Sequence, residues 1–139
     1  MPDLTKPKIL AVEDHRTVQE GYKAWAESLQ MELLQAYCLE EALALVEAHP
    51  DIAAVIVDGW VPYRRGEDVL PHPAETPLTA KLIIHLRGRR CGFTGPIVVA
   101  AGEPIGRRKL MEAGGTVAVE KEDAIRTALT RLGLPTRPR

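Results

Sequence analysis

The sequence predicts an α/β fold, a doubly wound five-stranded parallel sheet flanked by helices. Five short apolar runs alternate along the chain with segments of helical periodicity. The runs are apolar throughout, which is typical of parallel strands covered on both faces. The chain has 139 residues, 45% of them hydrophobic, which suffices for one domain with its own core. We expect that domain to span residues 1–134 and residues 135–139 to form a loose tail.

The first half of the chain contains three predicted strands, at residues 8–12, 33–37 and 53–57. Between them, apolar residues recur at spacings of three and four, which predicts two helices. The first helical face comprises Val18, Tyr22, Trp25 and Leu29, and the second comprises Leu39, Ala42, Leu43 and Val46. The pair His49-Pro50 should end the second helix, because the residue before a proline disfavours helical backbone.

The second half begins with an irregular segment, residues 59–77, which contains Pro62, Pro71, Pro73 and Pro77. Prolines at this density exclude a long helix or a central strand. Strands are predicted again at residues 97–101 and 116–119. The accompanying helices run from Leu78 to Gly88, from Pro104 to Gly114, and beyond Lys121 with Ile125, Leu129 and Leu132 facing inward.

The composition argues against several classes of protein. Cys38 and Cys91 are too few for a disulfide framework and lack metal-ligand spacing. No apolar run is long enough to span a membrane, and the N-terminus lacks the apolar core of a signal peptide. Only 4% of the residues are aromatic and no nucleic-acid-binding motif is present, so direct nucleic-acid binding is not expected. We therefore expect a cytoplasmic protein.

Charged residues gather at the ends of the predicted strands. Residues 1–70 carry 13 Asp and Glu against 6 Lys and Arg, which suits a cation site. In parallel sheets, ligands bind beyond the carboxyl ends of the strands. The residues there are Glu13 and Asp14 after the first strand, Asp58 after the third, Ala101 and Gly102 after the fourth, and Lys121 after the fifth.

This set of residues favours phosphoryl-transfer chemistry. Three carboxylates form a hard, oxygen-rich site of the kind that Mg²⁺ prefers. A lysine beside them adds the second positive charge that stabilises phosphoryl oxygens. An aspartate can itself be the nucleophile and form an acyl phosphate.

Three motifs resemble those of the receiver domain of two-component response regulators, over nearly the whole chain. The motif ILAVEDH resembles the first strand with its acidic pair, and VIVDGWVP resembles the phosphoacceptor strand with its downstream proline. The motif AGGTVAVEKE resembles the fifth strand with its lysine. The resemblance implies a flavodoxin-like fold of receiver type, with strand order 2-1-3-4-5.

The resemblance also implies a role for each site residue. Asp58 is the phosphoacceptor. The metal ligands for Mg²⁺ are Glu13, Asp14, Asp58 and the backbone carbonyl of Trp60. Lys121 pairs with the phosphoryl group, which the backbone amides of Ala101 and Gly102 also contact.

The sequence departs from the family pattern at several positions. The Ser or Thr that usually ends the fourth strand is Ala101, and the aromatic residue three before the lysine is Ala118. Both parts of the usual switch from phosphorylation site to surface are therefore missing. The proline after the lysine is Glu122, so we expect the Lys121–Glu122 peptide bond to be trans.

The segment 59–77 is longer than the family pattern, and two interpretations of it stay open. In one, Trp60, Tyr63, Arg64 and Arg65 form a lid that shelters Asp58 or supplies positive charge. In the other, the segment is a solvated, proline-rich excursion.

The leading functional hypothesis is a stand-alone receiver, not an enzyme. It accepts a phosphoryl group on Asp58 from a histidine kinase or phosphotransfer protein and signals by protein–protein interaction. The alternative is a pseudo-receiver that acts without phosphorylation, which Ala101 and Ala118 favour. A Mg²⁺-dependent phosphatase is a distant third, because Trp60 stands where dehalogenase-like phosphatases carry a second aspartate.

Overall fold

Five parallel strands form a single sheet in the order β2-β1-β3-β4-β5, as predicted. The computed structural model describes residues 6–29, 31–67, 69 and 76–136. The strands are β1 (Lys8–Val12), β2 (Glu32–Ala36), β3 (Ile52–Val57), β4 (Ile97–Val99) and β5 (Val117–Ala118). All neighbouring pairs run parallel, so the five carboxyl ends lie along one edge of the sheet.

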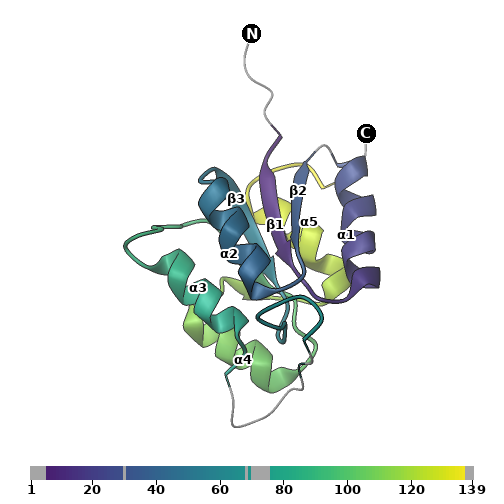
Figure 1. Ribbon diagram of the computed structural model, residues 1–139. Helices are drawn as coiled ribbons and strands as arrows, with labels where there is room; N and C mark the ends of the chain where they lie inside the picture. The colour runs from purple at the N-terminus through teal and green to yellow at the C-terminus, as the bar shows by residue number, and fades with distance from the viewer. Residues whose placement is uncertain (1–5, 30, 68, 70–75, 137–139) are drawn as a thin grey trace.

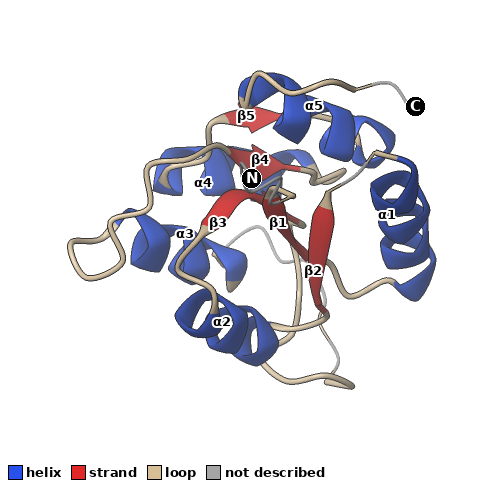
Figure 2. Cartoon of the chain, turned by 90° about the horizontal axis from the view of Figure 1, so that it is seen from above, coloured by secondary structure: helices blue, strands red, loops and turns tan. Residues whose placement is uncertain are grey.

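Helices connect successive strands and cover both faces of the sheet (Figures 1 and 2). They are α1 (Arg16–Ser28), α2 (Leu39–Ala48), α3 (Thr79–Arg87), α4 (Pro104–Ala113) and α5 (Ala124–Arg131), the last preceded by a 3₁₀ turn, η1 (Lys121–Asp123). Figure 2 shows α1 and α5 on one side of the strands and α2, α3 and α4 on the other. None of the described helices combines the length and apolar character that crossing a membrane requires.

Each face of the sheet has its own hydrophobic layer, because alternate strand residues point to opposite faces. In β1, Ile9 packs with α1 and α5, whereas Leu10 packs with α2, α3 and α4. Both side chains are fully buried. This double coverage explains why the strands are apolar throughout and why the sequence predicts them well.

Several predicted details are wrong: β2 lies one residue earlier than the predicted 33–37, and β5 is two residues shorter than the predicted 116–119. Trp25 was placed on the buried face of α1, but it is 37% exposed, because the buried stripe runs through Gln19, Tyr22 and Ala26. The strand predicted at residues 97–101 ends as β4 at Val99, because β5 pairs with it over only two residues.

The long segment after β3 contains no helix or strand in its described residues, as its prolines predicted. Residues 68 and 70–75, which include Pro71 and Pro73, lie outside the described residues, as do residues 137–139 of the predicted tail. No described peptide bond is cis, so the Lys121–Glu122 bond is trans, as predicted.

Candidate functional site

The predicted site residues converge at the carboxyl-terminal edge of the sheet. Glu13 and Asp14 follow β1, Asp58 follows β3, and Lys121 opens η1 after β5. Strands β1 and β3 are neighbours, and the N–H of Asp58 continues their pairing by donating to the carbonyl of Val12 over 2.9 Å. The carboxylates therefore project from adjacent strand ends.

A lysine and a histidine contact these carboxylates. Lys121 Nζ lies 2.9 Å from Glu13 Oε1 and 3.3 Å from Asp58 Oδ1. His15 Nδ1 lies 3.1 Å from the same Glu13 oxygen and 3.3 Å from Asp14 Oδ1. One potential ligand atom from each of Glu13, Asp14, His15 and Asp58 lies within 4.8 Å of the others. The structure thus brings together the predicted lysine and acidic residues, with His15 in addition.

Burial shapes the electrostatics of this cluster, in which Glu13 is 1% exposed and Asp58 is 7% exposed. Loss of hydration, reinforced by the charge of Asp58 and only partly offset by Lys121, raises the pKa of Glu13 to about 8. Burial also raises the pKa of Asp14. Burial lowers the pKa of Lys121, but the hydrogen bond to Glu13 and the charge of Asp58 outweigh that effect and raise it. Lys121 is therefore the charged partner of the cluster.

Gln19 fixes the connection between β1 and α1, a role that the sequence analysis missed. Its side chain is fully buried, and Nε2 lies 3.1 Å from the carbonyl oxygens of Ala11 and Glu13 and 3.0 Å from that of Ala36. These contacts hold the backbone from which Glu13 projects. The available signal was a polar residue three positions before Tyr22, on the buried stripe of α1.

Thr79 contacts the turn after Asp58 and was also missed. It is fully buried, and its hydroxyl lies 2.9 Å from the carbonyl oxygen of Asp58 and 3.0 Å from that of Gly59. The turn is also tightly packed against the end of β4, since a Cβ at Gly59 would lie 3.1 Å from the Ala101 Cβ. A threonine at a helix start is common, so nothing in the sequence linked it to Asp58.

Trp60 places its side chain against the first turn of α4. A Cβ at Gly106 would lie only 2.9 Å from the indole Nε1. The adjacent Glu103 carboxylate accepts hydrogen bonds from the N–H groups of Gly106 and Ile105, at 2.6 and 2.9 Å. The Gly106 amide, with smaller contributions from Ile105 and the indole, lowers the pKa of Glu103. The turn that follows Asp58 is therefore in contact with α4.

Tyr63, Arg64 and Arg65, which one interpretation made a lid over Asp58, contact α2. Arg64 Nε lies 3.3 Å from Glu40 Oε2, and Arg65 donates two hydrogen bonds to Glu41, of 2.8 and 3.0 Å. The carbonyl of Tyr63 accepts a hydrogen bond of 3.0 Å from the N–H of Glu40. The two guanidinium groups are thus engaged by α2 rather than by the acidic cluster.

Ala101 and Gly102 follow β4 at the same edge of the sheet. Ala101 is buried, and its carbonyl accepts hydrogen bonds of 3.0 and 2.8 Å from the guanidinium of Arg107. Arg107 also lies 3.7 Å from Glu120, just before Lys121. An arginine of α4 therefore links the ends of β4 and β5, where Ala101 offers no hydroxyl.

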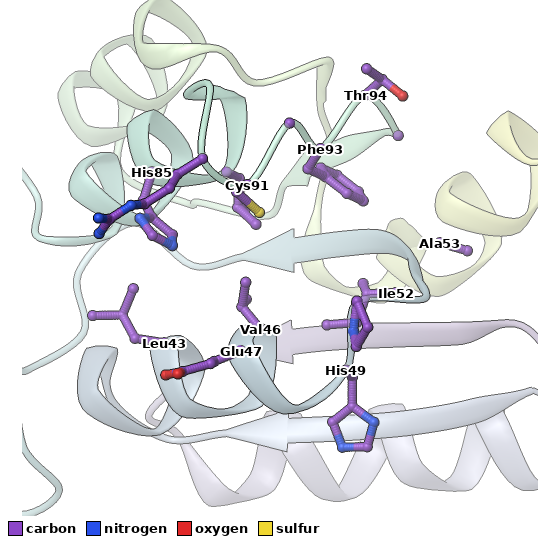
Figure 3. A pocket seen from close by; sticks show the side chains of 15 residues that line it. Leu43, Val46, Glu47, His49, Ile52, Ala53, His85, Cys91, Phe93 and Thr94 are labelled. Carbon is purple, nitrogen blue, oxygen red and sulfur yellow. The ribbon is translucent and has the colours of Figure 1, made fainter.

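A separate pocket of about 880 Å³ opens at the amino-terminal edge of the sheet (Figure 3). Leu43 and Val46 of α2 lie on one side of it, and Cys91 and Phe93 on the other. None of the predicted site residues lines it. The chemistry inferred from the sequence therefore concentrates at the opposite edge, around Asp58.

Several solved structures that match this fold are response regulators or their receiver domains. A putative response regulator from Chloroflexus aurantiacus is 21% identical with a TM-score of 0.70, and covers 93% of this chain and 99% of its own. A chemotaxis response regulator of Vibrio cholerae is 18% identical with a TM-score of 0.68, and covers 91% of this chain and 99% of its own.

A response regulator receiver protein from Pseudomonas putida is 18% identical with a TM-score of 0.66, covering 93% of this chain and 97% of its own. No protein-family model matches the sequence, and no curated protein matches it at a significant level. At these identities, the likeness establishes the fold.

Proposed function

Because the chain has the fold of response-regulator receiver domains, we propose that it is a phosphoryl-accepting receiver with Asp58 as the acceptor. The observation that carries the proposal is the contact of Lys121 Nζ with both Glu13 and Asp58, at 2.9 and 3.3 Å. A partly buried lysine between carboxylates of adjacent strands is the arrangement that a phosphoryl group on Asp58 requires, because the ammonium can pair with a phosphoryl oxygen.

The donor set around Asp58 fits Mg²⁺. Glu13 Oε2 is buried and accepts no hydrogen bond from any described residue, so an oxygen in the cluster is left for a cation. Magnesium prefers carboxylate and carbonyl oxygens, which Glu13, Asp14, Asp58 and the Trp60 carbonyl offer. When bound, the ion supplies positive charge to the transferring phosphoryl oxygens.

The proposed transfer uses Asp58 as the nucleophile. One carboxylate oxygen attacks the phosphorus of a phosphohistidine on a histidine kinase or phosphotransfer protein. The new O–P bond forms as the P–N bond breaks, and the bonding electron pair returns to the imidazole nitrogen, which leaves as neutral imidazole because the other ring nitrogen already carries a proton. Lys121 and the backbone amides of Ala101 and Gly102 orient the phosphoryl group. The chain is thus a phosphoryl acceptor, whose only reaction of its own would be hydrolysis of its acyl phosphate.

The proposal includes a cytoplasmic location, where ATP supplies histidine kinases, and output through a protein partner. Direct contact with nucleic acid or a membrane is not part of it. The competing candidate is a pseudo-receiver that binds partners without phosphorylation. Ala101 favours this candidate, because it has no hydroxyl for a phosphoryl oxygen and Arg107 already engages its carbonyl.

Intact-mass measurement after incubation with acetyl phosphate and Mg²⁺ tests the proposal. We expect the wild type to gain one phosphoryl group and Asp58→Asn to gain none. Asp51→Asn is the matched control, because Asp51 is exposed and pairs with Lys8 away from the cluster; it should be modified normally. A wild type that stays unmodified by acetyl phosphate and by a phosphorylated phosphotransfer protein would support the pseudo-receiver.

Tryptophan fluorescence tests the metal site separately. In a Trp25→Phe background, Trp60 is the remaining tryptophan and is adjacent in sequence to the phosphoacceptor turn. Addition of Mg²⁺ should change its emission saturably, and Asp14→Asn should abolish the change. An identical response in Asp14→Asn would remove Asp14 from the set of ligands.

A further inference from the structure

Thr79 hydrogen-bonds the start of the long irregular segment that connects β3 to α3. The chain leaves the sheet after β3, at Asp58, and regular structure resumes with α3, whose first residue is Thr79. There the threonine hydroxyl meets the carbonyls of Asp58 and Gly59, which lie 21 and 20 residues earlier. The two ends of the excursion are therefore joined directly behind the candidate phosphoacceptor.

The contact controls the orientation of two successive peptide units. The Asp58 and Gly59 carbonyl oxygens lie 2.9 and 3.0 Å from the same hydroxyl, which shares its one hydrogen between them. A trans peptide unit is planar, so fixing its carbonyl also fixes the N–H on its opposite side. Thr79 thereby sets the path of the backbone from Asp58 to Trp60, whose carbonyl is a candidate metal ligand.

Among the described residues, Thr79 is the side chain that hydrogen-bonds both carbonyls of the turn. Thr79 is fully buried, so water cannot replace its hydroxyl without repacking. On the other side, Gly59 approaches the Ala101 methyl group so closely that a Cβ would lie 3.1 Å from it. The turn is held between a hydrogen-bonding group on α3 and an apolar wall at the end of β4.

We propose that Thr79 is a positioning residue for phosphorylation: its hydroxyl holds the Asp58–Trp60 turn in the geometry that lets Asp58 accept the phosphoryl group. This inference rests on the proposed function and deepens it. It assigns a task to a residue that neither touches the phosphoryl donor nor belongs to the acidic cluster. It also explains how a long insertion is accommodated beside a site that demands accurate placement.

The test compares Thr79→Val, which keeps the shape and removes the hydroxyl, with Thr79→Ser, which keeps the hydroxyl. Rates of Asp58 phosphorylation are measured by intact mass over a range of acetyl phosphate concentrations at saturating Mg²⁺. We expect Thr79→Val to lower the maximal rate by about tenfold or more with little change in the half-saturating acetyl phosphate concentration, because misplacing the acceptor slows chemistry rather than binding. Thr79→Ser should react like the wild type.

Ile83→Val in the same helix is the stability control, because it trims a buried side chain that lies beside Gly114, before β5. It should lower the melting temperature and leave the rate unchanged. A Thr79→Val variant that reacts as fast as the wild type, or a Thr79→Ser variant as slow as Thr79→Val, would overturn the inference while leaving the proposed function intact. An unreactive wild type would overturn both.

Discussion

Glu13 carries a carboxyl group that is almost fully removed from water. Its carboxyl group is 1% exposed, and one of its oxygens contacts both Lys121 and His15, at 2.9 and 3.1 Å. Without a cation, loss of hydration and the charge of Asp58 favour the protonated form and raise the pKa of Glu13 from 4.5 to about 8. The protonation state of Glu13 therefore depends on whether a cation is present.

This predicts an unusual pH dependence for the metal-free protein. Between pH 4.5 and about 8, folded Glu13 keeps a proton that the unfolded chain releases, so its contribution to the free energy of unfolding falls as pH rises. Denaturation in the presence of a chelator, at a series of pH values, measures this contribution as the difference between wild type and Glu13→Gln. The difference should decline steadily over that range. A constant difference would mean that the pKa of Glu13 is not raised.

Gly106 is the residue that admits the Trp60 side chain. In an open helix, Gly→Ala stabilises by roughly 0.5–1 kcal/mol. At Gly106, however, a Cβ would meet the indole Nε1 at 2.9 Å and Glu103 Oε2 at 3.2 Å. We expect Gly106→Ala to destabilise by roughly 1–3 kcal/mol and to shift Trp60 emission, because overpacking forces the indole away.

Gly21→Ala is the matched control, because a Cβ at Gly21 of α1 would have open space. That variant should be slightly more stable than the wild type. Chemical denaturation with a Trp25→Phe background gives both stability and emission. If both alanine variants are stabilised, the indole moves freely and does not link the phosphoacceptor turn to α4.

At the scale of elements, Arg87 at the carboxyl end of α3 holds the connections that lead into β4 and β5. Its guanidinium donates to the carbonyls of Phe93 and Gly95 before β4, at 3.1 and 2.8 Å. It also donates to the carbonyl of Gly114 and the hydroxyl of Thr116 before β5, at 3.2 and 3.1 Å. One partly buried side chain thus sets the position of two connections.

We expect Arg87→Met to lower the free energy of unfolding by roughly 2–3 kcal/mol. The methionine keeps much of the apolar stem, but the four acceptors lose the charged group that donates to them. Arg89→Met removes an equal charge from the exposed neighbour and should change stability by at most about 0.5 kcal/mol. Urea denaturation of the two variants decides between these outcomes. Equal losses would attribute the effect to net charge.

The elements also show which features sequence patterns can predict. The strand at residues 8–12 is predicted to the residue, because charged residues, Lys8 and Glu13, mark both limits of its buried apolar run. The face of α1 is predicted less well, because the polar residue Gln19 occupies the buried stripe and Trp25 its exposed border. Hydrophobic spacing alone places Trp25 on the buried stripe and Gln19 outside it, which is the reverse of their positions in the structure.

In the candidate site too, some contacts could be predicted from the sequence and others could not. The meeting of Glu13, Asp58 and Lys121 could be predicted, because parallel strands bring their carboxyl ends to one edge. The contact of Thr79 with the turn after Asp58 could not be predicted, because it depends on where α3 begins after a long irregular segment. The spacing of hydrophobic residues does not reveal where the next helix packs after such a segment.

For the whole molecule, the sheet divides the interior into two separate hydrophobic layers. One layer includes Ile83 of α3, and the other includes Ile125 of α5; both residues are at least 98% buried, with exposures of 0% and 2%. Strand backbone lies between the two layers, so neither side chain shares a cavity with the other. Changes in one layer should therefore be independent of changes in the other.

We predict that Ile83→Val and Ile125→Val each cost about 0.5–1.5 kcal/mol and that the double variant costs their sum to within about 0.5 kcal/mol. Urea denaturation of the four proteins measures this. The pair Ile83→Val and Leu86→Val, within one layer, provides the contrast, because neighbours there relax together. A large coupling between the two layers would mean that the sheet transmits packing changes from face to face.

The amino-terminal end of α2 is capped by residues 62–63, which follow Asp58 in the chain. The first N–H groups of a helix have no partner within it and ordinarily exchange quickly with solvent. In α2, those of Leu39 and Glu40 instead donate to the carbonyls of Pro62 and Tyr63, at 2.9 and 3.0 Å. These two amide protons are thus slowed by a segment distant in sequence. In an NMR spectrum they become reporters of whether residues 62–63 stay docked when Asp58 changes its charge.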